Sequence, residues 1–433
     1  PARRCARRAT SSGPGSTVAA MLCAVPIVKI LDVTEFWSER GGGVRSHLTE
    51  KGRALAALGH QHVVVAPGPT DSTGWLDVPA SSPRDGQPSA TAAGASTRLI
   101  RVVGPAMPYD STYHLLARID RVRDVVLEER PDVLEVHSPY LAMIAALQVP
   151  RYGYGIRTFW WHADFVDTYL REGLRRVGLS GSGDRLLSPV WALVRSAASK
   201  CDATFVASRD QAEKLRAHSV PRVIQVPFGV DKAVFRPDVR SAQRRQELLE
   251  VFRQRRGKEP PTLLVGVGRF AIEKRWDVVL DALAKLRTQR DAVLVLFGDG
   301  PERSRLERHP MAAEAVHFAG FERNREQLAS ALASADVLVH GCPHETFGLS
   351  IAEALSCGLP VVVPDRGGAF EVGGPSGVSY KSLDAAACAD AMKQMLDRDP
   401  GERRAAALEA AAGLATVEGH MRAALAAMQA LPT

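Results

Sequence analysis

The sequence predicts an α/β protein built from two doubly wound domains that face a central cleft. Along almost the whole chain, short apolar runs alternate with Gly-rich turns and amphipathic helical segments, a pattern typical of parallel sheets. The chain has 433 residues, of which 45% are hydrophobic, and this is enough for two such domains with separate cores. Because ligands of open α/β sheets bind outside the carboxyl ends of the strands, we expect the substrate site between the domains.

The first part of the chain differs from the rest in composition. Residues 1–20 are rich in Arg, Ser and Ala and contain no acid. An organellar transit peptide has this composition, but Met21 directly precedes the first predicted strand, so we interpret residues 1–20 as a disordered leader. The net charge of +7 includes four arginines of this leader, and no dense basic run is interleaved with aromatics. This argues against nucleic-acid binding and permits contact with an anionic membrane surface.

Residues 21–230 are predicted to form the N-terminal domain. The Gly-rich helical segment GGGVRSHLTEKGRALAALGH separates its first two strands, and residues 68–97, rich in Pro, Ser, Thr and Gly, are predicted to form a long loop. The predicted strands lie in IVKILDV, HVVVAPG, TRLIRVV, PDVLEVHS, GIRTFWWH and ATFVAS.

A second series of strands predicts the C-terminal domain over residues 261–400. The polar helical residues 231–260 are predicted to connect the two domains, and the Ala-rich residues 401–433 to form a helical segment. The strands of the second domain lie in PTLLVGVGR, AVLVLFGDG, AVHFAG, ADVLVHG and LPVVVPD.

Cysteine usage and hydropathy indicate the compartment. The six cysteines have neither C-x-x-C nor Cys/His metal-ligand spacing, which is typical of reduced thiols in a cytoplasmic protein. No apolar run approaches the roughly 20 residues that span a bilayer. We therefore expect a cytoplasmic protein, at most peripheral on the inner face of the membrane, with organellar import through residues 1–20 as the alternative.

The most informative motif is HETFGLSIAEALSCGLPVV. Glu345 lies in the loop before a predicted helix, and Glu353 lies two turns into that helix. The backbone N–H groups of Gly348 and Leu349 at the helix start suit a phosphate or a sugar hydroxyl, and carboxylates accept hydrogen bonds from polyols. If this pair stood alone, the simpler interpretation would be that Glu345 interacts favourably with the helix dipole and that Glu353 lies on a solvated helix face. The other motifs of the chain favour the ligand-binding interpretation.

Two cations follow the first strand of the second domain. Arg269 and Lys274 stand in the loop after VGVG, where an Arg fork and a Lys point charge suit a diphosphate. The spacing from Gly266 to Ala271 resembles a dinucleotide fingerprint, but no helix opens at its last position. We therefore expect no nicotinamide or other cofactor.

Two features of the N-terminal domain are candidates for the opposite wall of the cleft. The triplet that ends in Gly42 and Gly43 allows close approach of backbone to a phosphate, although a plain flexible turn is the simpler interpretation. His162 ends an aromatic strand, where it can contact a sugar hydroxyl, although a lone histidine is more often structural. Trp160 and Trp161 are expected in the core.

The motifs occur together in an order that resembles the family-four retaining glycosyltransferases. The resemblance covers nearly the whole chain after Met21, and its signature is E-x7-E. It implies the GT-B fold, two Rossmann-like domains facing a cleft, and transfer of a mannose- or glucose-type hexose from a GDP- or UDP-linked donor to a lipid-linked or glycan acceptor. The segments that carry it are GGGVRSHL, WHADF, VPFGVDKAVFRP, GRFAIEK, LFGDGPE, AGF and HETFGLSIAEALSCGLPVV.

The resemblance also implies residue roles. Arg269 and Lys274 would clamp the donor diphosphate, Glu345 would hold the hydroxyls of the transferred sugar, and His162 would contact the sugar near the reacting centre. Glu353 would accept from the ribose. The implied donor-binding set is Gly42, Gly43, Phe347, Gly348, Leu349 and Glu353.

The implied mechanism is front-face substitution without a carboxylate nucleophile and without a metal, since the two cations supply the positive charge. The D-x-D formed by Asp397 and Asp399 precedes Pro400 and is interpreted as a helix end. A nucleotide-sugar 2-epimerase and a non-catalytic nucleotide-sugar-binding partner subunit are the alternatives. The HADF pattern resembles enzymes that glycosylate lipids, so a membrane-associated acceptor is expected.

Overall fold

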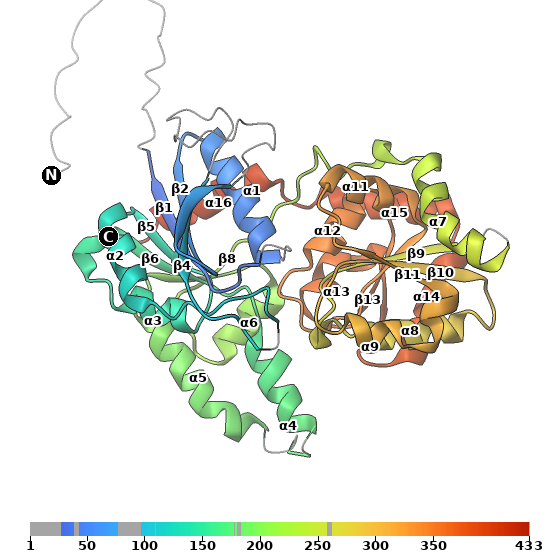
Figure 1. Cartoon of the computed structure of the whole chain (residues 1–433), viewed down its shortest axis with the longest axis horizontal. Helices are drawn as coiled ribbons and strands as arrows, with labels where there is room; N and C mark the ends of the chain where they lie inside the picture. Colours follow the sequence, from blue (N-terminus) through green and yellow to red (C-terminus); the bar gives the residue numbers. More distant parts are fainter. Residues whose placement is uncertain are drawn as a thin grey trace, which may run out of the picture.

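The computed structural model describes residues 27–38, 43–76, 97–108, 110–176, 178–179, 183–257 and 262–432. The predicted leader, residues 1–20, and Gly42 lie outside these ranges. Two α/β halves lie side by side (Figure 1), as the sequence predicts.

The first sheet has eight strands within the described residues, and all adjacent pairs are parallel except β3 with β4. Strand β3 falls inside residues 68–97, which were predicted to form a loop. Four of its five residues are exposed, so it lacks the alternation that marks a half-buried strand. In spatial order the strands are β3 (Ser72–Leu76), β4 (Thr97–Val103), β2 (Gln61–Gly68), β1 (Lys29–Val33), β5 (Val133–Val136), β6 (Ile156–Trp160), β7 (Ala203–Val206) and β8 (Val223–Gln225).

The second sheet, as far as the structure describes it, is a six-stranded, fully parallel sheet. Strands β9, β10 and β13 consist almost entirely of buried apolar residues, as expected for a parallel sheet covered on both faces. In spatial order the strands are β11 (Val316–Gly320), β10 (Ala292–Phe297), β9 (Thr262–Val267), β12 (Val337–Val339), β13 (Val361–Pro364) and β14 (Val378–Tyr380).

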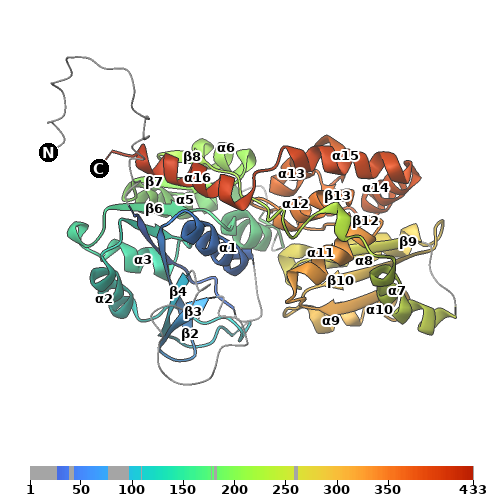
Figure 2. The same ribbon diagram turned by 90° about the horizontal axis from the view of Figure 1, so that it is seen from above.

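Helices cover both faces of each sheet (Figure 2). Around the first sheet lie α1 (Gly43–Ala57), α2 (Ile119–Glu129), α3 (Leu141–Leu147), the π-helical turn η2 (Val166–Arg171), α4 (Glu172–Arg176), α5 (Gly183–Ser199) and α6 (Arg209–Ala217). The later helices are α7 (Ala242–Arg256), α8 (Trp276–Leu286), α9 (Arg303–Glu307), α10 (Pro310–Ala315), α11 (Arg325–Ser334), α12 (Leu349–Ser356), α13 (Gly367–Gly373), α14 (Ala385–Asp397), α15 (Pro400–Ala412) and α16 (Val417–Gln429).

The chain crosses between the halves twice. Helix α7, inside the predicted connection of residues 231–260, packs against α10 and α11 of the second half. At the other crossing α16 returns to the first half and packs against α1 (Figure 2). The two crossings touch: Val230 N–H donates to Ala415 O at 2.9 Å, and a Cβ at Gly229 would lie 2.2 Å from Thr416 O, so only glycine fits there.

The strand orders place the ligand-binding edges. In the first sheet, strands before the β1–β5 pair are added on one side and later strands on the other, and in the second sheet the same switch in strand order falls between β9 and β12. Loops after these strands are where open α/β sheets bind ligands. No helix in the described part of the chain is both long and apolar enough to cross a membrane.

Candidate functional site

Arg269 follows β9 and reaches across to the first half of the chain. Its Nη2 donates to Asp110 Oδ2 at 2.6 Å, and its guanidinium lies 4.7 Å from the centre of the Tyr113 ring. The loop is held by Trp276, whose indole N–H donates to Arg269 O at 3.0 Å. Burial opposes the charge, but Tyr113 and Asp110 outweigh it and raise the pKa of Arg269. A permanent cation therefore stands at the domain boundary.

Lys274 and Glu345 form an ion pair between the loops after β9 and β12. His340, at the end of β12, lies with Nε2 3.2 Å from Glu345 Oε1. Burial acts against both charges, yet Lys274 and His340 hold the pKa of Glu345 well below its usual range, and Glu345 raises the pKa of Lys274. The predicted diphosphate cation and the predicted sugar-binding carboxylate thus meet in space.

The loop from Glu345 to Leu349 fastens the two halves together. Thr346 Oγ1 donates to His162 O at 2.8 Å, and the Phe347 ring meets the Phe228 ring edge-on at 5.5 Å. Gly348 precedes α12 with φ of +101°, where a Cβ would lie 2.9 Å from Ile351 Cδ1. The first residue of α12 is Leu349, so the N–H groups that this helix start leaves free follow Glu345 by four residues in the chain.

Glu353 has a different set of partners from Glu345. It is buried in α12, and its Oε1 lies 3.0 Å from Arg325 Nη2, which is also 2.5 Å from Glu50 Oε1 of α1. Burial raises the pKa of Glu353 despite Arg325. The sequence did not indicate Arg325, which ties the helix carrying Glu353 to the first half.

His162 follows β6, and Trp160 and Trp161 before it are buried core residues as predicted. The imidazole is partly buried, and its Nε2 lies 2.5 Å from His137 Nδ1. Burial, then His137, lower the pKa of His162, so its imidazole is neutral near pH 7. Gly43 begins α1, and no other atom of the described residues lies within 4 Å of the position that a Cβ would take there.

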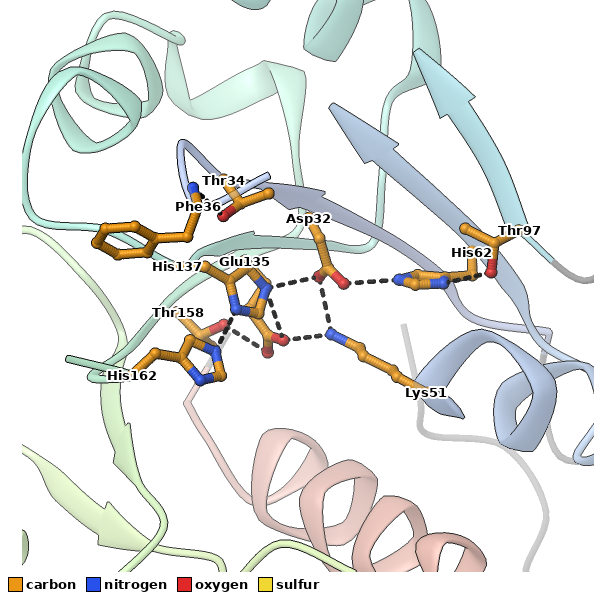
Figure 3. A network of polar contacts seen from close by, with 10 residues as sticks. All are labelled: Asp32, Thr34, Phe36, Lys51, His62, Thr97, Glu135, His137, Thr158 and His162. Atoms are coloured by element: carbon orange, nitrogen blue, oxygen red, sulfur yellow. Dashed lines mark hydrogen bonds and ion pairs between the residues drawn. The ribbon is translucent and has the colours of Figure 1, made fainter. Parts of the chain in front are cut away.

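Next to His162 lies a buried polar cluster that the sequence analysis missed (Figure 3). Asp32 and Glu135 are register partners on β1 and β5, and Lys51 of α1 contacts both carboxylates. His62 Nε2 donates to Asp32 Oδ2 at 2.6 Å, and its Nδ1 lies 2.8 Å from Thr97 Oγ1. The available signal was an acidic or imidazole residue among the apolar residues of each of three strands, Asp32 in β1, His62 in β2 and Glu135 in β5.

The D-x-D segment has the structural role that the sequence indicates. Asp397 ends α14 and pairs with Lys393 and Arg290, and Asp399 caps α15 by accepting from the Gly401 N–H at 2.8 Å. Both aspartates serve helix ends.

The geometry can stabilise a dianionic leaving group. On the second half of the chain, Arg269, Lys274 and the N-terminus of α12 supply positive charge, and Glu345 supplies hydrogen-bond acceptors for hydroxyls. The neutral His162 belongs to the first half, and its backbone carbonyl accepts a hydrogen bond from Thr346. A phosphorylated polyol, with its phosphates on the cations and its hydroxyls between Glu345 and His162, fits this distribution.

Two family models match the chain. The model described as "Glycosyl transferase 4-like domain" matches residues 42–230, and the model described as "Glycosyl transferases group 1" matches residues 250–413. Together they cover both halves.

Relatives match most of the chain. A GDP-mannose-dependent alpha-(1-6)-phosphatidylinositol dimannoside mannosyltransferase of Mycobacterium tuberculosis is 30% identical over 374 residues, which are 84% of each chain. A GDP-mannose-dependent alpha-mannosyltransferase of Mycolicibacterium smegmatis is 30% identical over 80% of this chain and 82% of its own. Among solved structures, the sucrose-phosphate synthase of Thermosynechococcus elongatus matches with a TM-score of 0.70 at 19% identity, covering 93% of this chain and 98% of that one. At this identity, the similarity supports a shared fold and carries no information about the substrate.

Proposed function

The chain belongs to the group 1, family-four glycosyltransferases with the GT-B fold and is a nucleotide-sugar glycosyltransferase, and from that premise we propose that it transfers mannose from GDP-mannose with retention of anomeric configuration. The donor assignment rests on the two mannosyltransferases described above, each 30% identical to this chain and named as GDP-mannose-dependent. A UDP-linked glucose-type donor is the alternative within the same chemistry.

The observation that carries the proposal is the contact of Lys274 with Glu345 beside the start of α12. In this assignment the donor diphosphate lies on Arg269 and Lys274, and the sugar hydroxyls lie on Glu345 and His162. Negative charge grows on the diphosphate as the glycosidic bond breaks, so fixed cations there lower the barrier more than they strengthen ground-state binding. Glu353 and the backbone of Phe347, Gly348 and Leu349 complete the donor contacts.

Retention is proposed to follow from front-face attack, in which the leaving phosphate accepts the acceptor proton. The acceptor oxygen bonds to the anomeric carbon, the bond to the phosphate oxygen breaks, and the proton passes to that phosphate. No carboxylate nucleophile is required. Metal independence is proposed because Arg269 and Lys274 already supply the charge that a divalent ion would bring.

The acceptor is proposed to be a lipid-linked sugar or a glycan, bound by the first half of the chain. The relative from M. tuberculosis is named for a phosphatidylinositol dimannoside acceptor. A membrane-bound acceptor of that kind would bring the protein to a membrane surface as a peripheral protein.

The test is a panel of donors: GDP-mannose, UDP-glucose, UDP-galactose and UDP-N-acetylglucosamine. Thermal stabilisation and slow donor hydrolysis are measured with and without a chelator. We expect GDP-mannose to stabilise the protein equally with chelator, and NMR of the product formed on a phosphatidylinositol mannoside to show an α-linkage. Binding of none of the four donors would contradict the transferase assignment, and loss of activity with chelator would contradict metal independence.

A further inference from the structure

A partly open cavity of about 140 Å³ lies on the second half of the chain. Asp336, which lines it, directly precedes β12, and its Oδ2 accepts from the backbone N–H of Leu263 near the start of β9 at 2.7 Å. The cavity therefore lies at the amino ends of these two strands. Because Arg269, Lys274 and Glu345 follow the carboxyl ends of the same strands, the cavity is separate from the candidate donor site.

Three arginines line this cavity: Arg240 ahead of α7, and Arg403 and Arg404 near the start of α15. In the described part of the chain, none of the three forms an ion pair with a carboxylate. Asp336 is the one acid among the described residues that line the cavity, and it pairs with Arg245 Nη2 at 2.8 Å. Four guanidinium groups thus surround one carboxylate, so the cavity carries an excess of positive charge.

The acids closest to Arg403 in the chain do not neutralise it. Asp397 pairs with Lys393 and Arg290, and Asp399 accepts from backbone N–H groups at the start of α15 at 2.8 and 3.0 Å. Glu402 is exposed to solvent and forms no ion pair within the described residues. The positive charge at the cavity is therefore left for a ligand.

Backbone carbonyls fix two of the guanidinium groups in place. Arg403 is only 8% exposed, and its Nη1 donates to Met395 O at 3.3 Å. Arg404 Nη2 donates to Ala333 O at 3.2 Å and to Cys357 O at 3.3 Å. These carbonyls orient the side chains but carry no full charge. The remaining N–H groups of both guanidiniums make no hydrogen bond to the described residues.

The pKa shifts of these arginines agree with a cluster that lacks its counter-charge. Burial, followed by Arg240, lowers the pKa of Arg404. Burial also lowers the pKa of Arg403, although Asp336 opposes it. At Arg269, by contrast, nearby groups outweigh burial and raise the pKa. An anion between the arginines would offset both their burial and their mutual repulsion.

We propose that this cavity is an anion site distinct from the donor site, and that it binds a phosphate group carried by inorganic phosphate or by a small phosphomonoester. Guanidinium forks bind phosphate oxygens in pairs, and a dianion matches several cations better than a single carboxylate does. The volume has room for roughly ten water molecules, which is more than one phosphate ion needs, so a phosphomonoester also fits. The proposal does not depend on the glycosyl transfer proposed above.

Arg240 is the best residue for the test. Its side chain is exposed and makes no hydrogen bond in the described residues, so a change there should leave the fold intact. Arg240→Gln removes the charge, whereas Arg240→Lys keeps the charge and loses the fork. Arg398→Gln is the matched control, since this arginine stands in the connection between α14 and α15 but does not line the cavity. Arg269→Ala controls for phosphate bound at the donor site.

Calorimetric titration of the full chain with sodium phosphate, and separately with glycerol 3-phosphate, measures the affinity at constant ionic strength. We expect saturable binding that Arg240→Gln weakens by at least about tenfold, and Arg240→Lys by less, because a hydrogen bond to a charged group is lost. Arg398→Gln and Arg269→Ala should leave the affinity unchanged. Binding should also raise the unfolding temperature, and less so in Arg240→Gln.

Binding of either ligand with this pattern supports the site, and the tighter ligand identifies the source of the phosphate group. Absence of saturable binding of both ligands up to about 10 mM would overturn the proposal. The same holds if Arg240→Gln binds phosphate as tightly as the parent, or if Arg269→Ala alone abolishes binding. Failure of every nucleotide sugar to bind would sink the proposed function and leave this test unaffected.

Discussion

Replacing Lys274 by Met is expected to separate folding from catalysis at the donor site. The side chain is partly buried against Glu345, and removing its ammonium leaves that carboxylate beside His340, 3.2 Å away, without its ion-pair partner. Breaking a buried pair on one side costs about 3–5 kcal/mol of folding free energy. Losing one stabilising charge in the transition state costs about 3 kcal/mol, or roughly a hundredfold in turnover.

The double variant Lys274→Met/Glu345→Gln distinguishes these two costs. Without the unpaired carboxylate, most of the folding free energy should return, whereas turnover should stay low because the phosphate cation is still missing. Urea unfolding gives the first quantity and donor hydrolysis the second. Arg275→Met is the control, since this adjacent cation pairs with Asp277 instead. Turnover within about threefold of the parent in the single variant would refute the role of Lys274.

The wild-type pair also predicts a pH dependence with a definite sign. Burial opposes ionisation of Glu345, but Lys274 and His340 overcome it, so its pKa lies below the ordinary value near 4.5. The stabilisation is therefore present above about pH 4.5 and is lost as the pH falls through the folded-state pKa. Unfolding measured from pH 6 down to pH 3 should show a steeper loss in wild type than in the double variant.

Three further predictions concern neighbouring residues. Arg269→Ala should lower turnover by about a hundredfold and should cost less unfolding free energy than Lys274→Met, because the backbone N–H and the hydroxyl of Thr112 still donate to Asp110. Donor hydrolysis and urea titration measure the two effects, and full activity would contradict the diphosphate clamp. Glu345→Ala should impair sugar transfer more than GDP binding, whereas Glu353→Ala should weaken GDP binding more, and calorimetry showing the reverse would exchange their roles. Burial raises the pKa of Glu50 to about 7, despite Arg325, so unfolding free energy should fall as the pH rises from 4.5 to 7. Glu50→Gln should remove that fall and be more stable at pH 8, by at most about 3 kcal/mol in urea unfolding, and an unchanged pH profile would count against it.

The sequence predicts most of this fold because buried parallel strands are recognisable one at a time. TRLIRVV coincides with β4, and the Val-rich run before Arg269 coincides with β9. The strands that were missed, β3, β8 and β14, are short edge strands in their sheets. An edge strand is held by its neighbour's hydrogen bonds more than by its own apolar pattern, so a sequence pattern carries little trace of it.

The donor-site candidates could be found from sequence because each follows a recognisable strand. The ends of β9 and β12 are adjacent at the switch point, and this places Arg269, Lys274 and Glu345 together. Partners could not be found in the same way. Glu50 and Arg325 come from different halves of the chain, and only their packing brings them together.

The buried cluster illustrates the same limit more sharply. Lys51 is 19 residues from Asp32 and 84 from Glu135, and no local motif links them. Only the register of β1 with β5 shows that two carboxylates adjoin and therefore need a cation. A charged residue in an apolar strand predicts that a partner exists, but the partner's identity is a property of the sheet.

A lysine contacts each cluster of metal-binding side chain types found in the described residues. In the described residues three groups of carboxylate, histidine or cysteine atoms lie close enough together to hold an ion, and each contacts an ammonium. The groups are Asp32, Glu135 and His137 with Lys51; Asp164, Asp167 and His344 with Lys214; and His340, Cys342 and Glu345 with Lys274.

A divalent ion would have to displace a paired ammonium from each of these groups, which costs the ion pair before any ligand bond forms. At the proposed donor site, the ammonium group of Lys274 supplies a positive charge that belongs to the protein itself. Because Glu345 raises the pKa of Lys274, that charge also persists into alkaline solution. Insensitivity to chelators and tolerance of high pH should therefore occur together, since both follow from one ion pair.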